Sequence, residues 1–142
     1  MNHLFSMTQR VYIEHTDAGG VVYHSNYLNF MERGRTDFMR NLGYEHRTTS
    51  VDDEFIFVVH SLEIQYKIPL QMDDEIIIAL DVSALKKTSV TFAQYIYQKT
   101  ENKLAATASV RVCSVSSRTL RPVAIPVKIF HQLSQKISAN LL

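Results

Sequence analysis

Cysteine, charge imbalance and long apolar segments are all scarce in this 142-residue sequence. The single cysteine, Cys113, cannot form a disulfide within the chain, and no second thiol lies near it to complete a zinc or redox pair. Fifteen basic and fourteen acidic side chains give a net charge of +1 without any block of like charges, so we expect no nucleic-acid partner. The opening MNHLFSMTQR lacks the pattern of a signal peptide, and no window reaches the length of a membrane span. These absences favour a cytoplasmic setting.

Internal repeats, low-complexity tracts and Pro- or Gly-rich linkers are also absent, and all four glycines precede residue 44. The chain is 46% hydrophobic and 20% charged, as expected of an ordinary globular protein. We therefore expect one domain spanning residues 1–142, which is long enough to bury a core.

The apolar pattern predicts one long helix near the start and a run of strands behind it. Residues 8–16 carry β-forming side chains and run into a turn, and helical spacing follows over residues 25–42 up to Gly43. Short polar turns join the later strands, which favours antiparallel neighbours. The predicted strands cover residues 56–67, 75–85, 89–99 and 103–115, and a short helix starts near Pro126. This order predicts an α+β fold in which an antiparallel sheet wraps around a central helix.

The stretch HTDAGGVVYHSNY, residues 15–27, combines an acid, two adjacent glycines, a histidine and two tyrosines just before the long helix. Aspartate before glycine is a common turn former, so on spacing alone Asp17 fits a turn residue as well as a catalyst. The alternative is a catalytic corner, a turn that presents this carboxylate beside the start of the helix.

The run HTDAGGVVYHSNYLNFMERGRTDFMRNLGY resembles the signature of the hotdog-fold acyl-CoA thioesterases. The resemblance is to the 4-hydroxybenzoyl-CoA thioesterase family, in particular its Tol-Pal-associated (YbgC-type) branch. It extends over nearly the whole chain and is supported by LEIQYKIPLQMDDEI and RTLRPVAIP. His15 departs from the pattern, since many relatives carry an acidic residue there.

The resemblance implies that Asp17 is the catalytic carboxylate, acting as a nucleophile or as the general base that activates a water. It implies that the backbone amide of His24 supplies the oxyanion site, with the imidazole in a supporting role. A thioester lacks most of the resonance stabilisation of an amide, and its leaving thiol has a pKa of about 8.5 by analogy with cysteine. One carboxylate and an oxyanion site therefore suffice.

Residues of the stretch 15–27, around the turn that carries Asp17, are expected to bind substrate. Gly19 and Gly20 lack a Cβ, which permits a sharp turn and a close approach of the substrate to the backbone. Tyr23 and Tyr27 are expected to pack in the core or the pocket wall.

The resemblance also implies that Lys86 and Lys87 hold the phosphates of coenzyme A, with Ser89 as a weaker candidate for a hydrogen bond. The alternative interpretation is that both lysines are solvated charges at a tight turn. Relatives form dimers, often paired into tetramers, with active sites at subunit interfaces. Coenzyme A arrives as part of the substrate, so no cofactor is expected.

Several other polar residues are assigned structural roles. Glu32 and Arg35 are spaced to pair on an exposed helix face, and Cys113 is expected to pack inertly within a strand. His60 alternates in register with apolar residues, which predicts a core or interface histidine. Metal-ligand spacing is lacking among His3, His46 and His131, so no metal is predicted.

Two other classes of protein also fit the sequence. A hotdog enoyl-CoA hydratase or dehydratase would use Asp17 and the His24 side chain to move a proton at carbon, although the acid and histidine spacing and the Gly-Gly turn favour a thioesterase. A non-catalytic acyl-CoA or acyl-carrier-protein binding protein would share the fold without the chemistry. Short aliphatic and aromatic acyl groups both fit the sequence.

Overall fold

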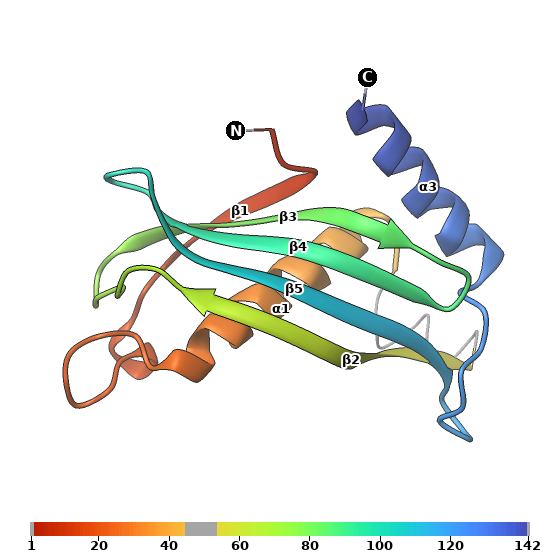
Figure 1. Cartoon of the computed structure of the whole chain (residues 1–142), viewed down its shortest axis with the longest axis horizontal. Coiled ribbons are helices and arrows are strands. Elements are labelled where there is room, and N and C mark those ends of the chain that lie inside the picture. Colours follow the sequence, from red (N-terminus) through yellow and green to blue (C-terminus); the bar gives the residue numbers. More distant parts are fainter. Residues whose placement is uncertain (1, 45–53, 142) are drawn as a thin grey trace.

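The computed structural model describes residues 2–44 and 54–141, so His46 lies outside the described residues. Five antiparallel strands form one sheet in the order β1-β3-β4-β5-β2, and the long helix α1 lies across one face of it (Figure 1). The predicted α+β arrangement is confirmed. The elements are β1 Phe5–Arg10, the 3₁₀ turn η1 Ile13–His15, α1 His24–Asn41, β2 Phe55–Tyr66, β3 Glu75–Leu85, β4 Ser89–Gln98, β5 Lys103–Ser116 and α3 Val127–Leu141.

Helix α1 packs tightly against the sheet at Gly34. A Cβ atom at this position would lie 2.8 Å from Cγ2 of Ile78 on β3, so a larger residue fits only if the Ile78 side chain or the helix shifts. Helix α1 ends at Asn41, and two residues later Gly43 has a φ of +89°, which is strained for other residues, and donates its N–H to the carbonyl of Arg40. The face toward the sheet buries Tyr27, Phe30, Met31, Gly34, Phe38 and Met39.

The core divides into two apolar clusters, one at each end of α1. The cluster at the helix C-terminus includes Phe38 and Phe92, and α3 closes it with Ile129 and Leu133. The cluster at the N-terminus surrounds Phe30 and includes residues of β3, β4 and β5. The helix start is therefore anchored in a core of its own.

The first strand lies earlier than the sequence predicts. It spans Phe5–Arg10 and pairs with β3 from Phe5 opposite Leu80 to Arg10 opposite Glu75. The prediction of a strand over residues 8–16 is wrong beyond Arg10, because the chain then turns into η1. This turn brings the chain from the sheet edge to the start of α1.

The expected burial of His60 in the core is also wrong for this chain. The pairing of β2 with β5 shifts between Val59 and Ser61, so His60 is the extra residue of a β-bulge, and its side chain is exposed. An interface role for His60 stays a prediction. The bulge reverses the alternation, so Val59 and Leu62 lie on either side of it as exposed apolar residues.

Candidate active site

The predicted corner is a tight reversal whose two arms form a β-bridge between Thr16 and Val22. The N–H of Asp17 donates to the carbonyl of Val21 at 2.9 Å, and the N–H of Gly20 donates to the carbonyl of Asp17 at 3.0 Å. Gly20 has a φ of +83°, the left-handed conformation that glycine adopts without strain. The glycine pair thus fixes the turn that presents Asp17.

The Asp17 carboxylate lies on the exposed side of this turn. Its Oδ1 accepts the Gly19 N–H at 2.8 Å, and a Cβ atom at Gly19 would approach the same oxygen to 3.2 Å. Within the described chain this amide is the single hydrogen-bond donor to the carboxylate. Asp17 therefore has the geometry of a turn former and keeps a carboxylate oxygen free for chemistry.

Helix α1 begins at His24, immediately after the second arm of the turn. The carbonyl of His15 accepts the Tyr23 N–H and the Asn26 side-chain amide, both at 2.9 Å, and the Asn26 N–H donates to Tyr23 at 2.8 Å. Among the described residues no hydrogen bond uses the amides of His24 and Ser25. Free amides at a helix N-terminus provide the electrostatics of an oxyanion site.

His15 joins the turn to the helix, a role that its sequence context does not predict. Its ring is 4% exposed, and Nδ1 accepts the Tyr12 N–H at 2.9 Å, so the proton of the neutral imidazole lies on Nε2. That Nε2 is buried without a hydrogen-bond partner in the described chain. Burial lowers the pKa of the His15 imidazole; the charge of Glu14 opposes this effect, and Arg33 adds to it. The imidazole is therefore held neutral.

An open cavity of about 270 Å³ lies beside the helix start and contains His24 and Tyr27 in its wall. The Tyr27 ring is buried, and its hydroxyl accepts the Leu70 N–H at 3.2 Å. The Tyr66 hydroxyl donates to the carbonyl of His24 at 3.2 Å. Tyr23, by contrast, is 47% exposed and is not a core residue. The lining comprises Val22, His24, Tyr27, Tyr66, Lys67, Ile68 and Pro69.

Tyr66 and Lys67 were missed as residues of this site. They belong to the run LEIQYKIP, where the alternation of polar and apolar residues predicts only a strand. The available signal was the end of that strand. A strand that ends beside a helix N-terminus places its last side chains at the site.

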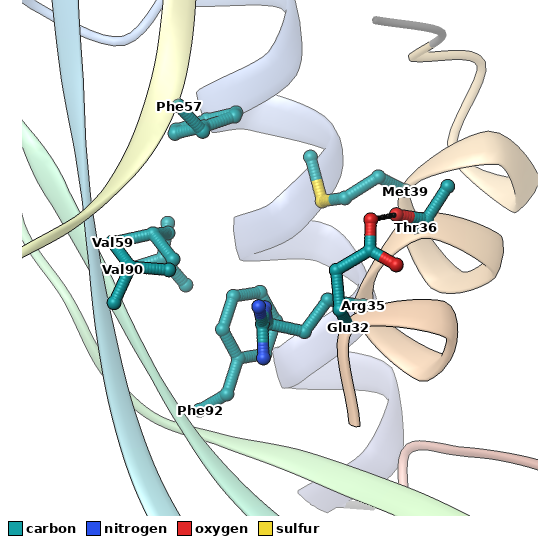
Figure 2. Close-up of a pocket in the computed structure, with 9 residues that line it drawn as sticks. Glu32, Arg35, Thr36, Met39, Phe57, Val59, Val90 and Phe92 are labelled. Carbon is teal, nitrogen blue, oxygen red and sulfur yellow. Dashed lines mark hydrogen bonds between the residues drawn. The ribbon is translucent and has the colours of Figure 1, made fainter. Parts of the chain in front are cut away.

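A second cavity, of about 150 Å³, lies between α1 and the sheet near β2 (Figure 2). The predicted pairing of Glu32 with Arg35 is wrong here: Glu32 accepts a hydrogen bond from Thr36 at 3.0 Å, whereas Arg35 donates to Gln94 at 2.9 Å. Arg35 reaches toward the sheet because Gln94 is fully buried opposite α1. The lining comprises Glu32, Arg35, Thr36, Met39, Phe57, Val59, Val90, Phe92 and Val112.

Lys86 and Lys87 lie in the exposed turn between β3 and β4. The Lys86 N–H donates to the carbonyl of Ser89 at 2.9 Å, and the Ser89 side chain is buried, with 2% exposed. Figure 1 shows this turn at the end of the sheet near α3, whereas the Asp17 turn lies at the opposite end. One chain therefore does not bring the lysines to Asp17.

Cys113 lies on β5 and is partly buried. No group of three or more His, Cys, Asp or Glu side chains in the described chain has the arrangement of a metal site. In the same part of the chain, neither α1 nor α3 combines the length and apolarity needed to cross a membrane.

A curved antiparallel sheet around one long helix, with an acid-bearing turn at the helix start, defines a hotdog-fold protein. A sequence profile described as the thioesterase-like superfamily matches residues 11–135. The acyl-CoA thioesterase YbgC of Haemophilus influenzae is 38% identical over 132 residues, which cover 91% of this chain and 96% of that protein. The corresponding protein of Helicobacter pylori is 31% identical over 138 residues and is covered completely. The chain therefore belongs to the thioesterase-like superfamily.

Solved structures agree with this assignment. A probable thioesterase from Bartonella henselae superimposes with a TM-score of 0.79 at 33% identity, over 86% of this chain and 98% of that one. A Staphylococcus aureus protein solved in complex with CoA has a TM-score of 0.88 over 94% of this chain and 84% of its own. At 17% identity, the latter supports the fold alone.

Proposed function

We propose that this chain hydrolyses acyl-CoA thioesters to the free acid and coenzyme A, with Asp17 as the nucleophile or general base and the start of α1 as the oxyanion site. The observation that carries the proposal is the junction between the turn and the helix. The exposed Asp17 carboxylate is held in the turn by the Gly19 N–H, which donates to Oδ1. This turn and the two free amides at the start of α1 belong to one hydrogen-bonded unit, joined through the His15 carbonyl.

The chemistry follows from these groups. The thioester carbonyl oxygen lies against the free amides of His24 and Ser25, which stabilise the negative charge that develops on it. Asp17 attacks the carbonyl carbon directly to form a mixed anhydride, which a water then hydrolyses to release the acid and restore Asp17, or Asp17 removes a proton from a water that attacks the carbonyl carbon. The carbon–sulfur bond breaks, and the thiolate leaves without an obligatory strong acid because its pKa is near that of cysteine, about 8.5.

The active enzyme is proposed to be a homodimer, or a tetramer built from two dimers. Strand β2 is an edge of the sheet, 12 residues long, with exposed Val58, Val59 and Leu62. Such an edge favours pairing with a second copy. Within one chain the turn of Lys86 and Lys87 and the turn of Asp17 lie at opposite ends of the sheet (Figure 1). Pairing would allow the lysines of one subunit to bind the substrate at the Asp17 of the other. Their exposed ammonium groups suit the phosphates of coenzyme A.

We further propose a cytoplasmic location and no cofactor beyond the coenzyme A of the substrate. Short aliphatic and aromatic acyl groups are the proposed substrates. The side chain of His24 is proposed to support the site rather than to transfer protons, and Gly19, Gly20, Tyr23 and Tyr27 to shape the approach of substrate.

The test is coenzyme A release from a panel of short aliphatic and aromatic acyl-CoAs, with the wild type compared with Asp17→Asn. We expect the substitution to lower kcat by about 100-fold or more, the range of general acid–base catalysis. Asp37→Asn is the matched control, because Asp37 lies on α1 away from the turn and pairs with the exposed Arg40 at 3.1 Å. An Asp17→Asn variant as active as the wild type would refute the mechanism. Water addition to an enoyl-CoA, without thioester cleavage, would identify a hydratase instead.

A further inference from the structure

Arg35 is a largely desolvated cation whose hydrogen-bond partner is a neutral amide. Its Nη1 donates to Oε1 of Gln94 at 2.9 Å, and Nε2 of Gln94 donates to the carbonyl of Met31 at 2.9 Å. Gln94 is 0% exposed, so both ends of its amide are fixed by these two bonds. Gln94 therefore anchors the guanidinium through Nη1 and leaves its other N–H donors unused by that amide.

No carboxylate in the described part of the chain lies within 4 Å of the Arg35 guanidinium. Glu32, one turn earlier on α1, is exposed and accepts the Thr36 hydroxyl at 3.0 Å. Figure 2 shows the Glu32 carboxylate directed along the helix toward Thr36, whereas the Arg35 guanidinium points toward Phe92 on the sheet. Burial lowers the pKa of Arg35, and the charge of Glu32 opposes this effect. A desolvated cation without a counterion is costly, and an anionic ligand would relieve that cost.

The cavity in front of Arg35 has walls that suit a small carbon skeleton. Apart from Glu32, Arg35 and Thr36, its lining is apolar and comprises Met39, Phe57, Val59, Val90, Phe92 and Val112. Its volume is about 150 Å³. A cavity of about this size in another protein holds one benzene molecule, so the space fits a chain of a few carbon atoms.

The proposed dimer places this cavity beside a catalytic corner, and in this respect the inference rests on the proposed function. Phe57 and Val59 lie in the first half of β2, whereas Tyr66 ends the strand and bonds the His24 carbonyl at the start of α1. In a full-length antiparallel pair of β2 strands, the first half of each strand lies against the second half of the other. The cavity of one subunit then lies next to the helix start of its partner.

We infer that this cavity receives the far end of the acyl group and that Arg35 selects acyl groups ending in a carboxylate, which are short dicarboxylic acid monothioesters. The thioester lies at the helix start of one subunit, and the carbon chain crosses the interface between the apolar walls. The terminal carboxylate pairs with the Arg35 guanidinium, whose planar fork matches its two oxygens. Arg35 is thus a specificity-determining residue and takes no part in breaking the thioester.

The experiment compares kcat/KM for three substrates: glutaryl-CoA, its neutral amide isostere 4-carbamoylbutanoyl-CoA, and butanoyl-CoA. The wild type should prefer glutaryl-CoA to the amide. Arg35→Met should lower kcat/KM for glutaryl-CoA by about 10- to 100-fold, as expected for the loss of a charge-assisted hydrogen bond, and leave butanoyl-CoA nearly unchanged. Arg35→Lys, which keeps the charge without the fork, should restore part of the preference. Arg40→Met is the matched control on an exposed face of the same helix.

Two results would overturn the inference. The first is a wild type that does not distinguish glutaryl-CoA from its amide. The second is an Arg35→Met variant that slows all three substrates equally, which would show that Arg35 neutralises a carboxylate of the protein or only supports the fold. Calorimetric affinities of the same thioesters for the Asp17→Asn variant test the cavity independently of turnover. If the wild type hydrolyses none of the thioesters while the Asp17→Asn variant still binds glutaryl-CoA more tightly than the amide, the proposed function is contradicted and the selection by Arg35 is supported.

Discussion

Replacing His15 with asparagine should remove a pH dependence from the stability of the fold. The neutral imidazole accepts the Tyr12 N–H on Nδ1 and packs edge-on against Phe30 at a centroid distance of 4.9 Å. Its Nε2 lies 3.9 Å from the nearest oxygen of the exposed Glu14, too far for a hydrogen bond. Protonation would therefore remove the acceptor for Tyr12 and bury a charge with little compensation. The Oδ1 of asparagine can take the place of Nδ1, and asparagine does not titrate.

The sign of the effect follows from the lowered pKa of His15. The unfolded chain binds a proton at this residue near its ordinary pKa of 6.5, whereas the folded chain resists protonation. The free energy of unfolding therefore falls as the pH drops below 6.5, and above that pH His15 contributes no slope. One proton sets the limiting slope at about 1.4 kcal/mol per pH unit. The imidazole contributes this dependence only while its pKa remains lower in the folded state.

Urea unfolding of the wild type and His15→Asn between about pH 5 and pH 7.5 measures this dependence. The other titrating groups are common to both proteins, so the difference in unfolding free energy isolates His15. We expect this difference, wild type minus variant, to be constant above pH 6.5 and to decrease below it, because the wild type alone loses stability there. His15→Ala, which provides no acceptor, should lose a further 1 to 3 kcal/mol or so at every pH. Parallel curves for the wild type and His15→Asn would refute the assignment of a buried neutral imidazole.

Three further substitutions test the packing around the site by urea unfolding. Tyr27→Phe leaves the buried Leu70 N–H without its acceptor and should cost about 1–3 kcal/mol; an unchanged midpoint would mean that water replaces the hydroxyl. Gly34→Ala should destabilise by about 1–3 kcal/mol despite the better helix propensity of alanine, because its Cβ meets Ile78; a gain in stability would show that α1 can move away from the sheet. Gly20→Ala should cost about 1–2 kcal/mol because of its positive φ, and a neutral result would mean that the turn relaxes.

The sequence by itself determined the order of elements and the position of the candidate catalytic turn. Strand periodicity, the long amphipathic segment up to Gly43 and the acid-glycine turn are local patterns, so the α+β fold and the location of Asp17 at a helix start could be predicted from neighbouring residues. The end of the first strand could not be predicted in this way. It is set by hydrogen bonds of Val11 with Asp73 and Asp74, which lie far away in the sequence. The bulge at His60 is likewise set by pairing with β5.

Only the tertiary structure decided which polar groups are buried and what they contact. Helical spacing predicted that Glu32 and Arg35 pair, yet the fully buried Gln94, on a strand about sixty residues away, draws Arg35 toward the sheet. In the sequence His15 is only a departure from the family pattern, whereas in the fold it is the buried residue whose hydrogen bonds connect the turn to α1. Hydrogen bonding and desolvation depend on which distant segments meet, and that information lies in the packing rather than in any local run of residues.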